Sequence, residues 1–388
     1  MSYTTPELTA QEVLRHAQEL LEEKLPLHAE GYKCTTDDLF KVLLGVAATQ
    51  STLEAVCADL VGTPDPHTIR GYFNEQFCVE ELPELEQQLN AALAAAVPHR
   101  VRCHAQEVAI DYHDRPYYGK GEQGQELWVR GKAKDGTTRF YRVATAYLVL
   151  NGLRVTLALR FVLPGDDTVS VLATLLSRVK TQGLQVSCLL LDKGFASVAV
   201  MDYLTRQGQA ALIACPIRGT TGGTRALCQG HKSYGTTHTF TGPQGVEFPA
   251  SLLVCRVFTT ARRTGCHRRQ AAWLVFVQIH LTLSPRYARH LYRSRFGIET
   301  SSRCEGQVQG WTTAKNPAYR FVLIALAFVL LNVWIHLRWL FTQVPQRGGR
   351  WLDTQRFQLP RFVKFLQWAL EAWYGCLRTI TAPALPRD

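Results

Sequence analysis

Apolar residues recur every three or four positions through most of the first hundred residues, which is the spacing of one helix face. The pattern is clear over residues 13–21 and 39–48. Two shorter helical segments, 52–61 and 67–73, are separated by a Gly-Thr-Pro break. A helix, a short turn and a second helix form the outline of a helix-turn-helix. We therefore expect residues 1–100 to form a helical region that binds DNA or mediates dimerisation.

The apolar pattern changes to that of β-strands after this helical region. Two runs rich in β-branched residues are joined by Asn151-Gly152, a strong hairpin signal. Further apolar runs alternate with amphipathic stretches, and this order predicts an α/β fold with a mixed sheet. In chain order, the predicted elements are strands over 108–111, 140–150 and 153–162, a helix over 168–180, a strand over 184–191, a helix over 197–207 and a strand over 210–215.

The alternation of helices and strands is lost after residue 215. Residues 216–250 are rich in Gly, Thr and Ser, and β-like runs follow over 251–259 and 271–283. We therefore interpret 216–283 as a β-rich insertion. Helical patterns resume afterwards, over residues 286–303, 321–339 and 361–377.

Charge is distributed unevenly over the 388 residues, whose net charge is +11. Residues 251–388 contain 20 basic and 5 acidic side chains, whereas residues 1–100 contain 6 basic and 16 acidic ones. A surface that binds a polyanion is therefore expected in the C-terminal third. The 11 cysteines include no CxxC pair, which favours a reduced, cytosolic compartment over a disulfide framework.

The most apolar stretch of the chain covers residues 321–335 and includes Asn332. A bilayer-spanning helix needs about 20 apolar residues, and this stretch is shorter. The pattern therefore favours a buried helix of a globular protein, with a membrane segment as the alternative.

Three acidic residues stand where catalytic carboxylates are expected in an α/β protein. Asp111 and Asp192 each follow directly after an apolar strand, and ligand sites of open α/β sheets lie at such strand ends. Glu299 is the first acid after residues 251–298, a stretch that contains none. Each of these acids could also be an ordinary strand-end or helix-surface residue.

The predicted helix around Glu299 carries three further functional candidates on the same face. Tyr292, Arg295, Glu299 and Arg303 are spaced by three, four and four residues, within about an 80° arc. The face combines a carboxylate with cations that can hold phosphates. An ordinary i,i+4 ion pair would give the same spacing.

These motifs resemble the insertion sequence 4 superfamily of transposases. Tyr292, Arg295 and Glu299 match the start of its YREK signature. The stretches AIDYHD, from residue 109, and LLLDKGF, from residue 189, are similar to its first and second aspartate motifs. The resemblance covers roughly residues 105–340. It implies an RNase H-like mixed sheet core with a β-rich insertion, flanked by N-terminal and C-terminal helical regions.

One position departs from this signature. A lysine is expected seven residues after the glutamate, and the chain has Gly306 there. Arg303 on the same helix face, or Lys315, could supply the missing cation for the phosphates of the transposon end.

The resemblance also implies a division of the chain and a set of partners. The partners are double-stranded DNA, as terminal inverted repeats and target DNA, and a second copy of the chain in a synaptic complex, with no membrane. The setting would be cytoplasmic and nucleoid-associated. The expected regions are helical (1–100), catalytic core (101–215), β-rich insertion (216–283), catalytic core again (284–345) and C-terminal helical (346–388).

The chemistry implied by the resemblance is Mg²⁺-dependent cleavage and strand transfer. Two Mg²⁺ ions, for which Mn²⁺ can substitute, assist in-line displacement at a phosphodiester. Asp111 would bridge both ions, while Asp192 and Glu299 would each bind one. Arg295 and Tyr292 would hold the adjacent phosphates. The alternatives are an RNase H-like nuclease that cuts without joining, and a decayed transposase that only binds DNA.

Overall fold

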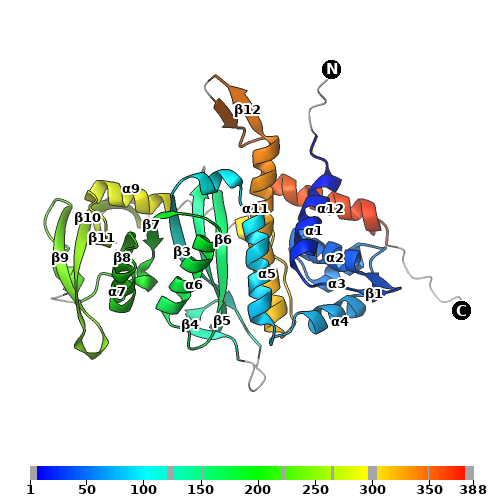
Figure 1. Ribbon diagram of the computed structural model, residues 1–388, viewed down its shortest axis with the longest axis horizontal. Coiled ribbons are helices and arrows are strands. Elements are labelled where there is room, and N and C mark those ends of the chain that lie inside the picture. Colours follow the sequence, from blue (N-terminus) through cyan, green and yellow to red (C-terminus); the bar gives the residue numbers. More distant parts are fainter. Residues whose placement is uncertain are drawn as a thin grey trace, which may run out of the picture. The chain divides into compact units, whose positions relative to one another are not determined.

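The computed structural model describes residues 7–119, 126–150, 153–219, 223–263, 266–295, 304–347 and 349–380. The chain forms two compact units, whose elements are labelled in Figure 1. One unit combines both ends of the chain, Met1–Val97 and Thr300–Asp388, with Gly119–Glu126. The other consists of Pro98–Tyr118 and Leu127–Glu299. The predicted regions follow chain order, whereas the first unit joins segments from opposite ends of the chain.

The unit built from the two chain ends is mainly helical. Its N-terminal helices bury their apolar faces against helices from the C-terminal end: α1 and α2 contact α12, and α5 contacts α11. Two short β-hairpins, β1–β2 and β12–β13, complete it. The elements are α1 (Ala10–Lys24), β1 (Glu30–Gly31), β2 (Cys34–Thr35), α2 (Thr36–Thr49), α3 (Leu53–Asp59), α4 (Pro66–Gln76), α5 (Leu82–Ala95), α11 (Pro317–Phe341), β12 (Gln343–Gln346), β13 (Gly349–Leu352) and α12 (Leu359–Tyr374).

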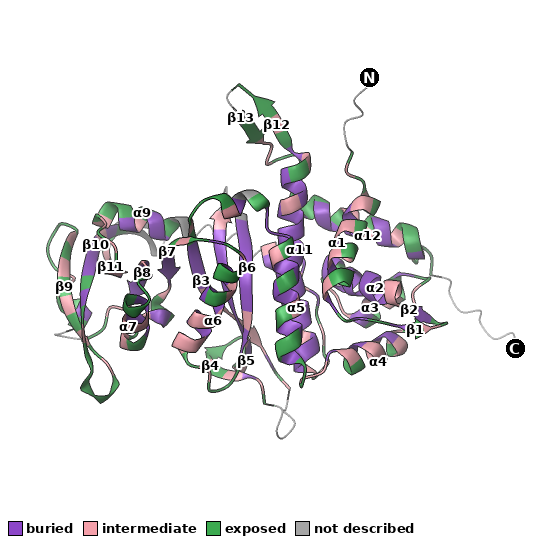
Figure 2. Cartoon of the chain, viewed as in Figure 1, coloured by how far each residue is buried: buried purple, intermediate pink, exposed green. Residues whose placement is uncertain are grey.

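The apolar helix α11 is buried over most of its length, as Figure 2 shows. It begins after Asn316, whose side chain accepts hydrogen bonds from the N–H groups of Ala318 and Tyr319. Within the helix, the Asn332 amide donates to the carbonyl of Leu93 on α5, at 3.4 Å. Its most apolar window is 89% buried, although its length and composition would also suit a membrane span. The prediction of a buried helix is confirmed.

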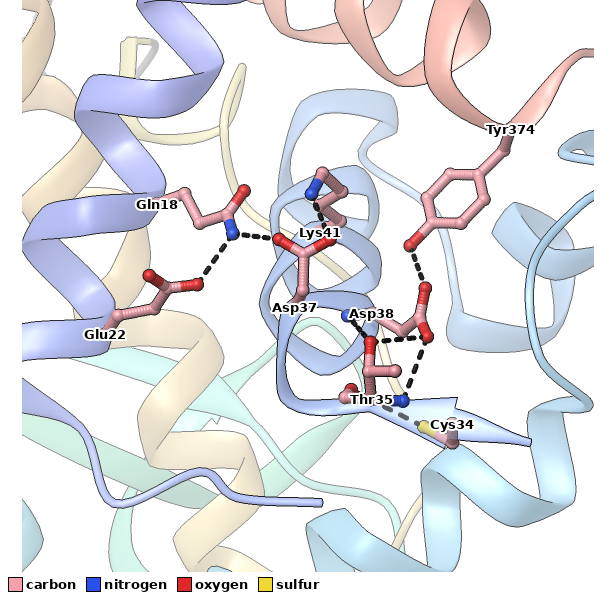
Figure 3. A network of polar contacts seen from close by, with 8 residues as sticks. All are labelled: Gln18, Glu22, Cys34, Thr35, Asp37, Asp38, Lys41 and Tyr374. Carbon is pink, nitrogen blue, oxygen red and sulfur yellow. Dashed lines mark hydrogen bonds and ion pairs between the residues drawn. The ribbon is translucent and has the colours of Figure 1, made fainter. Parts of the chain in front are cut away.

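A network of polar side chains joins α2 to α12, as drawn in Figure 3. The Tyr374 hydroxyl donates to Asp38 at 2.7 Å, and the Thr35 N–H donates to the same carboxylate at 2.9 Å. Burial alone would raise the pKa of Asp38, but these hydrogen bonds and the Lys41 charge lower it below its ordinary value. The buried ammonium of Lys41 pairs with Asp37. The network therefore favours the ionised carboxylate of Asp38 at the start of α2.

The second unit is built on a nine-stranded mixed sheet. Its centre has the order β6-β5-β3-β7-β8, with β3, β5 and β6 antiparallel and β3, β7 and β8 parallel. Helix α6 connects β6 to β7, and α7 connects β7 to β8. This order confirms the predicted RNase H-like core. The elements are η1 (His99–Cys103), β3 (Gln106–Pro116), β4 (Val129–Lys134), β5 (Thr137–Leu150), β6 (Leu153–Val162), α6 (Thr168–Thr181), β7 (Val186–Leu191), η2 (Lys193–Phe195), α7 (Val198–Arg206) and β8 (Ala211–Cys215).

The predicted β-rich insertion forms strands that continue the same sheet. The strand β11 (Cys266–Ile279) pairs with β8, and β10 (Glu247–Arg263) and β9 (Tyr234–Thr241) follow, all antiparallel. The strand expected over 271–283 was placed too late, because β11 begins at Cys266 and ends at Ile279. His280 follows with φ 49°, a conformation that interrupts a strand. Helix α9 (Pro285–Arg295) comes next, and α8 (Gly223–Ala226) and η3 (Pro243–Gly245) are short turns.

The two faces of the central sheet are covered by different helices. Arg160 on β6 contacts Thr174 on α6, and its register partner on β5 is Ala144. The neighbouring residue Thr145 therefore belongs to the opposite face. That opposite face carries Tyr147, which packs in one apolar cluster with residues of α9. Helix α9 thus covers the sheet face to which the odd-numbered residues of β5 point.

Candidate active site

The two predicted aspartates lie on adjacent backbone segments at the centre of the sheet. The strands β3 and β7 are parallel, and Ile110 is the register partner of Leu191. Asp192 directly follows β7, as predicted, whereas Asp111 lies inside β3, which continues to Pro116, and not at a strand end. The two residues follow the paired positions, on backbones about 4.8 Å apart, the ordinary spacing of paired strands. Both are half-buried. Strand pairing therefore places on adjacent backbone segments two carboxylates that are separated in the sequence by β4, β5, β6 and α6.

The backbone after β7 turns sharply at Asp192. The carboxylate of Asp192 accepts a hydrogen bond from the Gly194 N–H, and this cap starts the short helix η2. On the neighbouring strand, one carboxylate oxygen of Asp111 lies 3.0 Å from the Tyr112 N–H. Asp111 and its register partner Thr145 on β5 share the sheet face covered by α9. The carboxylates are thus presented from a rigid sheet centre.

A buried polar cluster lies beside Asp111 on this face. His113 Nε2 is 3.1 Å from Thr145 Oγ1, and Arg154 Nη2 is 3.1 Å from the same His113 nitrogen. The Arg154 guanidinium, 5% exposed, also donates to Thr145 and lies 3.9 Å from the centre of the Tyr147 ring. The cluster places a permanent cation next to the register partner of Asp111.

The electrostatics of this cluster keep its histidine neutral. Burial penalises a charged imidazole, and the cations Arg154 and Arg115 add to the penalty, so the pKa of His113 falls well below its ordinary value. A neutral His113 can accept the hydrogen bond that Arg154 offers. The sequence shows His113 two residues after Asp111. Because β3 continues to Pro116 and side chains alternate between the faces of a strand, two residues at this spacing point to the same face. This spacing is the feature of the sequence that could have identified His113 as a neighbour of Asp111.

The residues of the predicted YREK face are only partly described. The Tyr292 ring packs in the core, 6% exposed, with its centre 4.9 Å from that of Phe276. Arg295 is the last residue of α9, and its phosphate contact stays a prediction. Glu299 and Arg303 lie outside the described residues, so their roles stay predictions as well.

Two further residues of the predicted site belong to the helical unit. Lys315 is exposed and directly precedes Asn316, the cap of α11. Gly306, which occupies the position of the signature lysine, is exposed in a turn in which the Gln307 N–H bonds to the Cys304 carbonyl. A turn at Gly306 means that this position does not continue a helix face.

Comparison with known proteins finds a likeness among solved structures. No protein-family model and no curated protein matches the chain. Among solved structures, the chain is similar to the cryo-EM structure of a piggyBac transposase synaptic complex with hairpin DNA, with a TM-score of 0.56 and 8% sequence identity. The match covers 95% of this chain and 78% of that one. At this identity, the likeness establishes a shared fold.

Proposed function

We propose that the chain is a DDE-type DNA transposase, which cuts DNA at transposon ends and joins the ends to target DNA. The observation that carries this proposal is the adjacency of Asp111 and Asp192 on β3 and β7. A carboxylate on the central strand of an RNase H-like sheet, beside one at the end of the neighbouring strand, is the arrangement that such chemistry requires. The fold shared with the piggyBac transposase, whose structure contains DNA, supports the same class of function.

The residues at this site fit divalent metal ions. Mg²⁺ prefers hard oxygen ligands and retains several waters, so two half-buried carboxylates with a third acid form a sufficient donor set. Asp111, Asp192 and Glu299 would hold the two ions, with Mn²⁺ as a substitute. Bound ions of this kind activate the attacking oxygen and stabilise the leaving oxygen of a phosphodiester displacement. Among the described residues, no three His, Cys, Asp or Glu side chains lie together as metal ligands would, and Glu299 lies outside these residues.

The surrounding residues of the chain would position this chemistry. Asp111 sits on the strand at the centre of the core, so its carboxylate is the more rigidly held of the two. Arg154 would hold His113 and Thr145, the side chains beside Asp111 on β3 and β5, in fixed positions by hydrogen bonds. Its positive charge would offset the negative charge of the carboxylates. Arg295 and the Tyr292 hydroxyl would hold phosphates of the bound strand, and Lys315 or Arg303 would take the place of the missing signature lysine.

We also propose the finer assignments that the sequence motifs suggest. These are membership of the insertion sequence 4 superfamily, recognition of terminal inverted repeats, action as a homodimer in a synaptic complex, and a cytoplasmic, nucleoid-associated setting. The order of the three acidic motifs and the strands between β8 and α9 support this assignment.

The decisive experiment measures cleavage and joining of labelled DNA that carries the element's own ends. Wild type is compared with Asp111→Asn, Asp192→Asn and Glu299→Gln in Mg²⁺ and in Mn²⁺. We expect wild type to cut and join, and each variant to bind DNA without doing either. Cutting without joining would identify a nuclease. Binding without cutting by wild type, in either metal, would identify a protein that only binds DNA.

A further inference from the structure

A basic cavity lies between α9 and the β10 strand of the α/β unit. Its volume is about 310 Å³, and none of the residues that line it is acidic. The cations come from two segments that are separated by a strand in the sequence. They are Arg256 on β10 and, on α9, Arg286, Arg289, His290 and Arg293.

The four α9 residues form one helix face. Positions 286, 289, 290 and 293 follow the i, i+3, i+4, i+7 spacing and fall within about a 100° arc. The other side of α9 is apolar, because Ala288, Leu291 and Tyr292 pack in the core of the sheet. The cavity is therefore separate from the Tyr292 face, which was predicted from the sequence to hold phosphates.

In the part of the chain that the structure describes, Arg286, Arg289 and Arg293 form no ion pair. His290 has an acid nearby, Glu107, whose pKa is raised by burial, an effect that His290 partly offsets. Like charges three or four residues apart destabilise a helix by a few tenths of a kcal/mol per pair. A bound anion would remove this repulsion.

The wall of the cavity on β10 is fixed in place. The Arg256 guanidinium donates to the His231 carbonyl at 3.0 Å, and the Arg256 N–H donates to Ser233 Oγ at 2.9 Å. The Cys255 thiol donates to the Pro285 carbonyl at 3.3 Å, which ties β10 to the start of α9. Burial raises the pKa of Cys255 to about 11, so this thiol is protonated and unreactive at neutral pH. The cavity thus offers cations and no reactive thiolate.

We infer that this cavity holds backbone phosphates of a DNA strand, at a site distinct from the carboxylates. The inference rests on the proposed function, because that function makes DNA the polyanion that the chain meets. From residue 286 to residue 293 the helix rises about 10 Å, enough to face more than one phosphate of a strand. Arginine forks bind phosphate oxygens well without reading bases. The site therefore anchors DNA independently of sequence.

The test uses the full chain with Arg286→Gln, Arg289→Gln and Arg293→Gln combined. The control combines Arg356→Gln, Arg361→Gln and Lys364→Gln, exposed residues in or just before α12 of the other unit, and removes the same charge. Binding of a duplex of random sequence is followed by fluorescence anisotropy over a range of KCl concentrations. For the cavity variant, we expect about tenfold or more weaker binding and a salt slope smaller by about three. The control should keep the wild-type slope.

The inference would be overturned if the salt slope of the cavity variant were unchanged, or if the control variant lost as much DNA affinity as the cavity variant. It would also be overturned if micromolar ATP occupied the cavity while the substitutions left the DNA affinity unaffected. The last would mark a pocket for free nucleotides. Circular dichroism and thermal melting verify that both variants fold. Because this assay measures DNA binding without cleavage, the proposal for the cavity and the proposal of transposase activity can be refuted independently of each other. A wild type that binds through the cavity but never cuts retains this site and loses the transposase assignment.

Discussion

The rings of Tyr112 and Phe195 stack with their centres 5.0 Å apart and their planes 3° from parallel. Tyr112 follows Asp111 on β3, and Phe195 ends the η2 turn that Asp192 caps. Phe195 is fully buried, and the Arg142 guanidinium lies 5.2 Å from the Tyr112 ring centre. The stack therefore connects the two backbone segments that carry the carboxylates, on the sheet face opposite to that of Asp111.

Replacing Phe195 by leucine should impair cleavage more than folding. Loss of the stack costs about 1 kcal/mol, and the η2 turn should then shift relative to β3. Since a displacement of about 1 Å in a catalytic group can cost about 100-fold in rate, we expect a rate loss near that size. Single-turnover cleavage and thermal melting measure both effects. Phe161→Leu, buried on β6, is the control and should lower stability while leaving the rate within a few-fold of wild type.

Replacing the buried Arg154 by methionine should reduce cleavage at least tenfold while DNA binding is retained. Methionine fills the space but cannot donate to Thr145 or His113, so these two side chains beside Asp111 lose the hydrogen bonds from Arg154. The matched control is Arg160→Met, six positions along β6, whose side chain contacts Asp166 and α6 instead. Equal rate losses in the two variants would mean that Arg154 contributes only to stability.

The sequence predicts the strands and helices of the core well, because local patterns determine them. The Asn151-Gly152 hairpin signal correctly separates β5 from β6, and the apolar run before Asp192 correctly identifies β7. The register between strands is harder to predict from the sequence, because it depends on pairing between strands that are far apart in the chain. For this reason the motifs suggest a role for Asp111 and Asp192, but only the pairing of Ile110 with Leu191 makes them neighbours.

The cluster around Arg154 and the composition of the helical unit could not be predicted in this way. Nothing in the local pattern of β6 shows that Arg154 points into the protein, since arginine is normally exposed. Similarly, the amphipathic pattern of α1 shows that one face is buried but not that α12 covers it. Such contacts depend on tertiary packing between segments that are far apart in the chain.

Removing the hydroxyl of Tyr374 should destabilise the helical unit by about 1 kcal/mol at neutral pH. The hydroxyl stabilises the ionised form of Asp38, whose folded pKa is lowered. The contribution is therefore fully present above the ordinary aspartate pKa of about 3.9, and is lost as the pH falls through the lowered value. Urea unfolding of Tyr374→Phe and wild type at neutral and acidic pH measures the difference. Tyr32→Phe, fully exposed in the same unit, should show none.

Replacing Gly310 by alanine should be strongly destabilising, because a Cβ there would lie 2.4 Å from Cγ1 of Val46 on α2. Overpacking of this kind typically costs 1–3 kcal/mol, so we expect a loss of about 2 kcal/mol. Shortening the neighbour with Val46→Ala should restore part of the stability in the double variant. In contrast, Gly71→Ala on α4 meets no atom within 4 Å and should be neutral or stabilising. Thermal melting of wild type, Gly310→Ala, the double variant and Gly71→Ala measures these differences in stability. A double variant no more stable than Gly310→Ala would contradict this contact.

The assembly of one unit from both chain ends has a consequence during protein synthesis. Helices α1, α2 and α5 leave the ribosome long before α11 and α12, the helices that cover their apolar faces. At translation rates of about 5–20 residues per second, the N-terminal helices wait roughly ten seconds or more for these partners. During that interval their exposed apolar surface is a target for chaperones and proteases, so the yield of folded protein should depend on how quickly the residues from the end of α5 to the end of α12 are translated.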